Sequence, residues 1–192
     1  MMRVIGGCLK GKKILLPIDK NTRPLRDLVK ESIFNLLKHS KKLNFDITDS
    51  NILDLFSGSG SFGIECISRG AKKVTFIESY VEGIKILKKN IINLNMQKKT
   101  DIVCQDCFKY LENIKKPNEK YDLIFLDPPF KEKKINQLIK EILNKNFLNK
   151  NGILITHRHK KDETLMIRKL RILETRKYGI SKIIFWKMGY LK

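Results

Sequence analysis

The amino-acid sequence predicts an α/β fold of the Rossmann kind, built on a mostly parallel sheet of seven strands. From residue 51 onward, short apolar segments rich in β-branched residues alternate with longer segments of helical periodicity. This alternation is typical of a parallel sheet that is covered by helices on both faces. Near the C-terminus it stops, and two strand-like segments follow each other across Gly179. They predict an antiparallel hairpin at the end of the sheet.

The first 45 residues have a different pattern and are expected to form a basic extension to the main domain, residues 46–192. Short apolar segments at 3–6 and 12–16 lie around three glycines and predict a small hairpin. Thr22 and Pro24 are expected to open a helix. Its apolar face is predicted to contain Leu25, Leu28, Val29, Ile33, Leu36 and Leu37.

The main domain is expected to contain five parallel strands, at residues 51–56, 73–78, 101–104, 121–127 and 152–156. Helices are predicted between them at 61–69, 80–95, 107–114 and 132–146, and the final hairpin at 170–178 and 182–188. In open sheets of this kind, ligands bind beyond the carboxyl ends of the strands. Polar residues that directly follow a strand are therefore the candidate site residues.

The charge of the chain indicates a polyanionic partner. The 192 residues carry a formal net charge of +20. Residues 1–45 and residues 158–192 each have eleven Lys or Arg against three Asp or Glu. Two basic ends favour a nucleic-acid-binding face over uniform solvation, although a lysine-rich genome would also contribute to the total. No apolar run is long enough to span a membrane and no signal peptide is evident, so we expect a cytoplasmic protein.

Cysteines and histidines predict neither disulfides nor a metal site. The four cysteines are scattered, and Cys104 and Cys107 form one C-x-x-C pair without a second. The three histidines, His39, His157 and His159, lack ligand spacing with them.

A glycine loop follows the first strand of the main domain, in the segment that runs from Asp54 to Gly63. Gly58, Gly60 and Gly63 match G-x-G-x-x-G, and Glu78 lies twenty residues beyond Gly58 at the end of the next strand. A carboxylate at that position can accept hydrogen bonds from both ribose hydroxyls. The pattern predicts an adenosine-containing cofactor, and a nicotinamide dinucleotide remains open at this point.

Asp106 follows the third strand and is expected to face the same crevice. Its carboxylate could accept a hydrogen bond from the adenine amino group. The alternative is an N-cap for the helix that begins near Cys107, and both roles are compatible.

The segment Asp127-Pro128-Pro129-Phe130 after the fourth strand carries the sharpest chemical signal. Asp127 and the Pro128 carbonyl can each accept one hydrogen of a planar amino group, which frees the nitrogen lone pair to attack a sulfonium methyl. Phe130 can stack on a base and hold it outside its helix. The alternative is an ordinary turn, since D-P-P is also good turn chemistry.

Arg23, Arg26 and Lys30 recur at helical spacing on one face of the predicted N-terminal helix. They are either a solvated face or a set of phosphate contacts, and the sequence supports both readings equally.

These motifs together resemble a known family. The helix motif R23-P24-x₄-V29-K30-E31-x₂-F34-N35, the loop D54-L-F-S-G-S-G, Glu78 and D127-P-P-F follow one another as in the RsmD-type bacterial methyltransferases of 16S ribosomal RNA, which modify guanine N2. Leu25 and Lys30 stand where that family usually has Thr and Arg.

The resemblance implies the Rossmann-like fold of S-adenosylmethionine-dependent methyltransferases. It places the methionine end of the cofactor at the loop around Ser57, Gly58 and Gly60, the ribose at Glu78 and the adenine at Asp106, with Asp54 and Cys107 as further cofactor-binding residues. Asp127, Pro128 and Phe130 would be catalytic, while Pro129, Arg23, Arg26 and Lys30 would contact substrate. The implied partner is 16S rRNA, in a small ribosomal subunit or its assembly intermediate, and the protein is expected to be a monomer without metal.

Four other functions are weighed against this one. Methylation of adenine N6 in DNA would use the same D-P-P-F chemistry, but the chain has no room for a separate DNA-recognition domain. Glutamine methylation in a protein normally uses a motif that begins with Asn. A nicotinamide-dependent oxidoreductase is disfavoured because the sequence shows no Tyr-Lys or His-based arrangement for hydride transfer. An inactive RNA-binding module would have no need for Asp127.

Overall fold

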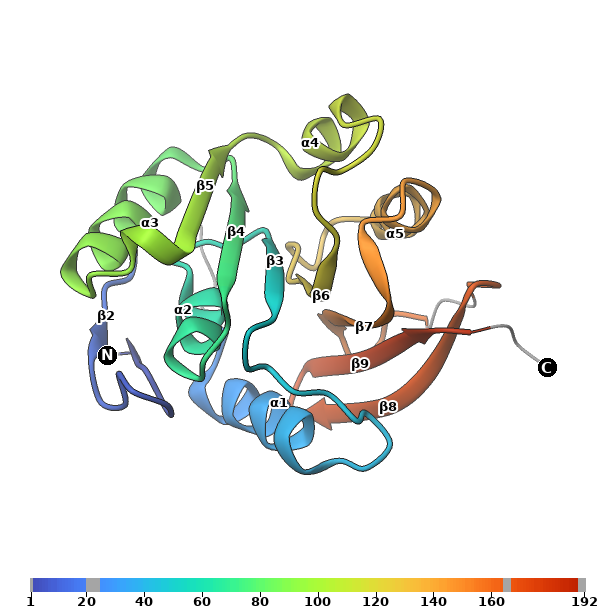
Figure 1. Ribbon diagram of the computed structural model, residues 1–192, viewed down its shortest axis with the longest axis horizontal. Helices are drawn as coiled ribbons and strands as arrows, with labels where there is room; N and C mark the ends of the chain where they lie inside the picture. The colour runs from blue at the N-terminus through green and yellow to red at the C-terminus, as the bar shows by residue number, and fades with distance from the viewer. Residues whose placement is uncertain (1, 20–24, 164–166, 190–192) are drawn as a thin grey trace.

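The computed structural model describes residues 2–19, 25–163 and 167–189, and they form one seven-stranded sheet, a two-stranded sheet and the helices around them (Figure 1). The strands of the large sheet lie in the order β5-β4-β3-β6-β7-β9-β8. The elements are β1 Met2–Arg3, β2 Lys13–Ile14, α1 Asp27–His39, β3 Asn51–Leu55, α2 Ser61–Ser68, β4 Lys73–Glu78, α3 Val81–Asn93, η1 Gln97–Lys99, β5 Thr100–Cys104, α4 Cys107–Asn113, β6 Tyr121–Leu126, α5 Ile135–Asn144, β7 Leu148–His159, β8 Leu170–Tyr178 and β9 Ser181–Met188.

The predicted α/β architecture is confirmed. Strands β3 to β7 pair in parallel, and β9 runs antiparallel to both of its neighbours, β7 and β8. The hairpin turn between β8 and β9 contains Gly179 with φ 57°, a left-handed conformation that glycine adopts without steric cost. The chain reverses its direction across the sheet between β3 and β6, which creates the topological switch point where such folds bind ligands.

Strand β7 is longer than predicted at both ends. At its start Leu148 already pairs with Tyr121, and the register shifts before the next pair, Leu123 with Ile153. At its end β7 continues beyond Thr156 because it pairs with β9 as far as His159. This second extension holds three polar residues in the sheet next to the turn that follows β6.

Helices cover both faces of the sheet and create two hydrophobic cores. One core packs α1, α2 and α3 against sheet residues such as Ile52 and Phe76. The other packs α4 and α5 against alternate residues of the same strands, such as Leu53 and Ile77. Residues that are buried on both faces explain why these strands are apolar almost throughout.

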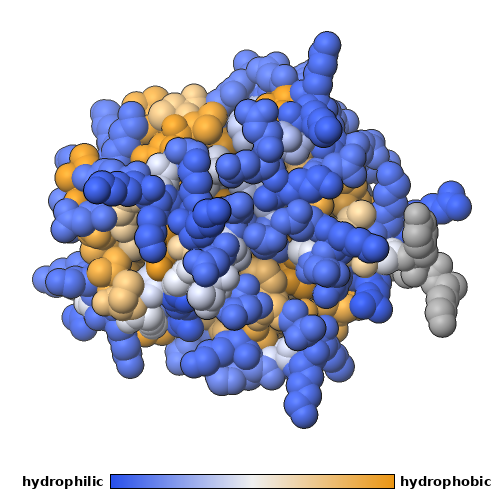
Figure 2. All heavy atoms as spheres, in the orientation of Figure 1, coloured by the Kyte–Doolittle hydropathy of each residue, from blue (hydrophilic) through white to orange (hydrophobic). Residues whose placement is uncertain are grey.

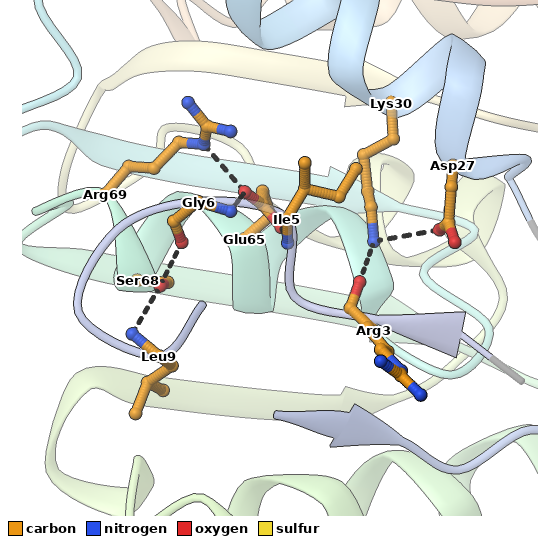
Figure 3. A network of polar contacts seen from close by, with 9 residues as sticks. All are labelled: Arg3, Ile5, Gly6, Leu9, Asp27, Lys30, Glu65, Ser68 and Arg69. Atoms are coloured by element: carbon orange, nitrogen blue, oxygen red, sulfur yellow. Dashed lines mark hydrogen bonds and ion pairs between the residues drawn. The ribbon is translucent and has the colours of Figure 1, made fainter. Parts of the chain in front are cut away.

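The N-terminal extension packs on α2 and shares the first core (Figure 3). The fully buried Glu65 carboxylate accepts hydrogen bonds from the backbone N–H groups of Ile5 and Gly6, each at 2.7 Å, and from Arg69 Nε. Ser68 Oγ donates to the Gly6 carbonyl and accepts from Leu9 N–H. The predicted hairpin is present as β1 and β2, but its short ladder depends on these contacts with α2.

Helix α1 differs from its prediction in two respects. It begins at Asp27, and Thr22 and Pro24 lie outside the described residues. Leu28 was expected on the apolar face and is 67% exposed. The buried face is centred on Val29, Ile33 and Leu37 at four-residue spacing, which turns Leu28 toward solvent.

The position of Lys30 contradicts both interpretations given for it, a solvated helix face and a phosphate contact. Its side chain has no exposed area, and Nζ donates to the Arg3 carbonyl at 3.0 Å and lies 3.7 Å from the Asp27 carboxylate (Figure 3). Burial lowers the pKa of Lys30, although Glu65 and Asp27 favour its charged form. A lysine held in this way joins the hairpin to α1 and does not reach a phosphate. Arg26 is exposed, and Arg23 lies outside the described residues.

Hydrophilic side chains cover most of the face shown in Figure 2, consistent with the excess of basic residues. Among the helices of the described residues, none is long and apolar enough to cross a membrane. In the same part of the chain, no group of three or more His, Cys, Asp or Glu side chains is arranged to hold a metal ion.

Candidate active site

Four predicted acidic residues follow or end adjacent strands at the carboxyl edge of the sheet. Asp106 follows β5, Glu78 ends β4, Asp54 lies in β3 and Asp127 follows β6. Since the strand order is β5-β4-β3-β6, these carboxylates occur in that spatial order along one edge. The structure therefore brings together the acidic residues that the strand-end rule selected.

The glycine loop between β3 and α2 is built by left-handed backbone at Phe56, Gly58 and Gly60, with φ of 60°, 54° and 80°. A Cβ on Gly60 would lie 2.3 Å from Leu87 Cδ1, so close packing excludes a side chain there. A Cβ on Gly58 would meet no atom within 4 Å. The loop thus packs tightly at Gly60 and leaves the backbone accessible to a ligand at Gly58.

Glu78 holds this loop in place. The N–H of Gly58 donates to Oε2 at 2.6 Å, and the N–H groups of Ser79 and Tyr80 donate to Oε1 at 2.8 and 2.7 Å. The side chain is buried at the end of β4. Each carboxylate oxygen has two lone pairs, and the backbone bonds use both on Oε1 and one on Oε2, so Oε2 retains acceptor capacity for one ribose hydroxyl.

Asp54 is buried behind the glycine loop. It is 1% exposed, and its Oδ2 accepts the Gly63 N–H at 3.1 Å. Burial raises the pKa of Asp54 well above its ordinary value, and the nearby carboxylates of Asp127 and Glu78 raise it further. The three acidic groups belong to or follow the adjacent strands β4, β3 and β6. Asp54 therefore supports the glycine loop through its hydrogen bond with the Gly63 N–H.

Asp106 and Cys107 lie at the start of α4, just after the end of β5. Asp106 is the N-cap, as the alternative reading predicted, and its Oδ1 accepts the N–H groups of Phe108 and Lys109 at 3.0 and 3.1 Å. The described residues make no hydrogen bond to Oδ2, which leaves an acceptor for adenine. Burial raises the pKa of the Cys107 thiol. Cys107 is 2% exposed and its side chain packs in the second core, so a cofactor contact would come from its main chain.

The Asp127–Phe130 turn lies next to the glycine loop, because the Asp127 N–H donates to the Leu55 carbonyl at 3.4 Å. Asp127 and Phe130 are partly exposed, Pro128 is buried and Pro129 is exposed. An acceptor amine that enters here would face both the Asp127 carboxylate and the glycine loop.

Three residues that the sequence analysis did not assign to the site support this turn. His157 Nδ1 lies 2.7 Å from Asp127 Oδ1, and its Nε2 lies 2.8 Å from Ser181 Oγ. The Arg158 guanidinium donates to the carbonyls of Pro129, Phe130 and Glu132 at 3.3, 3.4 and 2.8 Å. His157 had been considered only as a metal ligand. The strand-end rule could have selected it, because His157 directly follows the predicted strand at 152–156.

The residues present fit S-adenosylmethionine. Asp106, Glu78, the open backbone at Gly58 and Asp127 lie along four successive strands, about 5 Å apart. Adenine, ribose and the methionine portion follow one another in the same order in the cofactor. The sulfonium methyl would then point toward the Asp127 turn. A pyrophosphate-bearing dinucleotide would leave that turn without a role.

The sheet order and the antiparallel hairpin beside β7 show a Rossmann-like fold, and the relatives described next define the class of the protein: it is a methyltransferase. Residues 2–187 match the protein family described as Conserved hypothetical protein 95. The chain belongs to that family, which confirms the resemblance noted from its motifs.

Individual relatives agree with this membership. The chain is 37% identical over 153 residues to the ribosomal RNA small subunit methyltransferase D of Buchnera aphidicola subsp. Baizongia pistaciae, covering 80% of this chain and 74% of that protein. It is 32% identical over 182 residues to the protein of the same name from Haemophilus influenzae, covering 93% and 90%. The solved structure of yhhF from Escherichia coli superposes with a TM-score of 0.83 at 25% identity, covering 99% of both chains.

Proposed function

We propose that this enzyme transfers a methyl group from S-adenosylmethionine to the exocyclic N2 amino group of a guanine in 16S ribosomal RNA. The observation that carries the proposal is the position of the Asp127 turn, which is hydrogen-bonded to the end of β3 and lies beside the cofactor loop. The names of the relatives from Buchnera and Haemophilus, small subunit methyltransferase D, support the substrate.

The cofactor supplies an electrophilic methyl group on a positively charged sulfur. Asp127 accepts a hydrogen bond from one N–H of the guanine amine, and the Pro128 carbonyl accepts the other. These bonds orient the nitrogen lone pair toward the methyl group, so catalysis rests largely on positioning. The amine nitrogen would receive the methyl group that the bound cofactor supplies, S-adenosylhomocysteine would be the leaving group, and the proton lost by the amine would pass through the Asp127 carboxylate to water. Phe130 stacks on the base, which stabilises its extruded position by roughly 1–3 kcal/mol.

Docking of the RNA is assigned to the basic ends of the chain. Residues 1–45 form the extension that we assign to RNA contact, with the exposed Arg26 as its representative among the described residues. Residues 46–192 form the catalytic unit. A net charge of +20 supplies the long-range attraction to a polyanion. The enzyme would act in the cytoplasm as a monomer, on a small ribosomal subunit or its assembly intermediate.

One experiment tests the substrate directly. The protein is incubated with labelled cofactor and small ribosomal subunits from a strain that lacks it, and the RNA is digested to nucleosides. We expect the label in N2-methylguanosine, and no label with Asp127→Ala. Label in N6-methyladenosine would replace the proposal with its nearest alternative, because the D-P-P-F chemistry serves any exocyclic amine. Absence of label in any nucleoside would refute it.

A further inference from the structure

Three residues at the end of strand β7 contact the Asp127–Phe130 turn. His157 contacts the Asp127 carboxylate and Arg158 contacts the turn carbonyls. The rings of His157 and His159 each lie 5.4 Å from the Phe130 ring in edge-on geometry. This set of contacts exists because pairing with β9 continues the strand through His159.

His157 differs from Arg158 and His159 because it contacts the Asp127 carboxylate, the group proposed to bind the amine of the substrate. The side chain is 4% exposed and is held between two partners, Asp127 on Nδ1 and Ser181 on Nε2. Ser181 is itself buried at the start of β9. The described residues make no hydrogen bond to Asp127 Oδ2. His157 is thus hydrogen-bonded to Oδ1 of Asp127, and Oδ2 can accept a hydrogen bond from the amine of the substrate.

We propose that His157 is a positioning residue for methyl transfer, which holds Asp127 Oδ1 so that Oδ2 is directed at the amine of the substrate. The Ser181 hydroxyl donates to Nε2 and keeps the imidazole proton on Nδ1, where it is donated to Asp127. The inference rests on the proposed function, because it deepens the role of the same carboxylate.

The physical reason is the torsional freedom of aspartate. The terminal torsion of an Asp side chain is broad and roughly two-fold, so a carboxylate with one unanchored end samples many orientations. Attack on the methyl group requires the amine lone pair in line with the breaking bond, and misplacement by about 1 Å can cost a hundredfold in rate. A hydrogen bond that orients a catalytic group from behind is therefore expected to increase kcat without a direct contact to substrate or cofactor.

A matched pair of substitutions separates this role from simple support of the fold. In His157→Asn the side-chain amide nitrogen lies near the original Nδ1 position and can still donate to Asp127. In His157→Gln the amide reaches the Nε2 position and retains only a bond to Ser181. Each variant loses one of two hydrogen bonds, so a purely structural role predicts equal damage in both.

The assay measures kcat on small ribosomal subunits, with the affinities for cofactor and RNA measured separately. We expect His157→Gln and His157→Ala to lower kcat by about tenfold to a hundredfold, and His157→Asn to remain within about threefold of the wild type. Affinities for cofactor and RNA should change less than twofold. Asn144→Ala, at an exposed position at the end of α5, is the control and should change nothing. Equal kcat for the Asn and Gln variants, or a fully active Ala variant, would overturn the proposal.

A second measurement does not depend on turnover. The chain has three histidines, so nitrogen NMR of the histidine-labelled protein can assign His157 by comparison with the variants. We expect its proton on Nδ1 in the wild type and a changed Nδ1 signal in Asp127→Ala. A proton on Nε2 with an unprotonated Nδ1 would contradict the inference. If the wild type methylates no guanine while Nδ1 carries the proton, the proposed function fails and the orientation of His157 stands.

Discussion

Replacement of Glu78 by alanine tests the loop and the cofactor site in one experiment. The wild-type carboxylate accepts three backbone N–H groups, from Gly58, Ser79 and Tyr80, at 2.6 to 2.8 Å. Hydrogen bonds to a charged group contribute about 1.5–3 kcal/mol each, or roughly 4.5–9 kcal/mol for three, and hydration of the released N–H groups together with removal of a buried charge near Asp54 offsets part of that loss. We expect the free energy of unfolding to fall by about 3–4 kcal/mol. For a chain of 192 residues this corresponds to a decrease in Tm of about 10 °C.

The same substitution is expected to weaken S-adenosylmethionine binding, because the ribose loses its acceptor and the loop loses its anchor. One charge-assisted hydrogen bond corresponds to a factor of about 10–100 in Kd. Calorimetric titration, well below the Tm of the variant, measures this loss. Glu82→Ala removes an exposed carboxylate of α3 and is the matched control. A lower Tm with unchanged cofactor affinity would show that Glu78 stabilises the loop without binding the cofactor. An unchanged Tm would refute the expected contribution of its three hydrogen bonds to stability.

Three further outcomes are expected. Asp127→Ala should lower kcat by at least about a hundredfold while cofactor Kd stays within twofold, because Asp127 acts on the acceptor; near-normal activity would disprove the mechanism. Burial raises the pKa of Asp54, so the folded state binds a proton that the unfolded chain releases, and stability falls as pH rises from about 4 toward the folded-state pKa. Asp54→Asn removes that proton, so its Tm relative to the wild type should increase from pH 5 to pH 8, and a constant difference would contradict this reading. Affinity for 16S rRNA should fall with added salt, with a log–log slope steeper than about −2; a flat profile would exclude the basic ends as the docking surface.

Most of the architecture was predictable because the central strands β3, β4 and β6 are buried on both faces and helices separate the parallel strands along the chain. The pattern of apolar runs reports that burial directly, and the sheet strands were found within a few residues, apart from β7. The start of β7 was missed because its first pair, Leu148 with Tyr121, precedes a register shift. Its end was missed because His157–His159 are held by pairing with β9, a segment more than twenty residues away.

In the candidate site, too, local patterns were predictable from the sequence and contacts between distant residues were not. Residues that follow strands were identified because all parallel strands end at one edge, and this rule selected Glu78, Asp106 and Asp127. Lys30 was misread because an exposed helical face and a buried ion pair have the same spacing. Its partner is a carbonyl of Arg3, which only the docked hairpin brings within reach.

By itself, then, the sequence determined the order of strands and helices, the glycine loop, the acidic strand ends and the D-P-P-F turn, since each is a local pattern of burial or backbone conformation. Only the tertiary structure decided which groups orient one another. His157 lies thirty residues from Asp127 and Glu65 sixty from Ile5, and their hydrogen bonds depend on the sheet register and on helix packing. Such partners are chosen by the folded position of the backbone, and no local spacing encodes them.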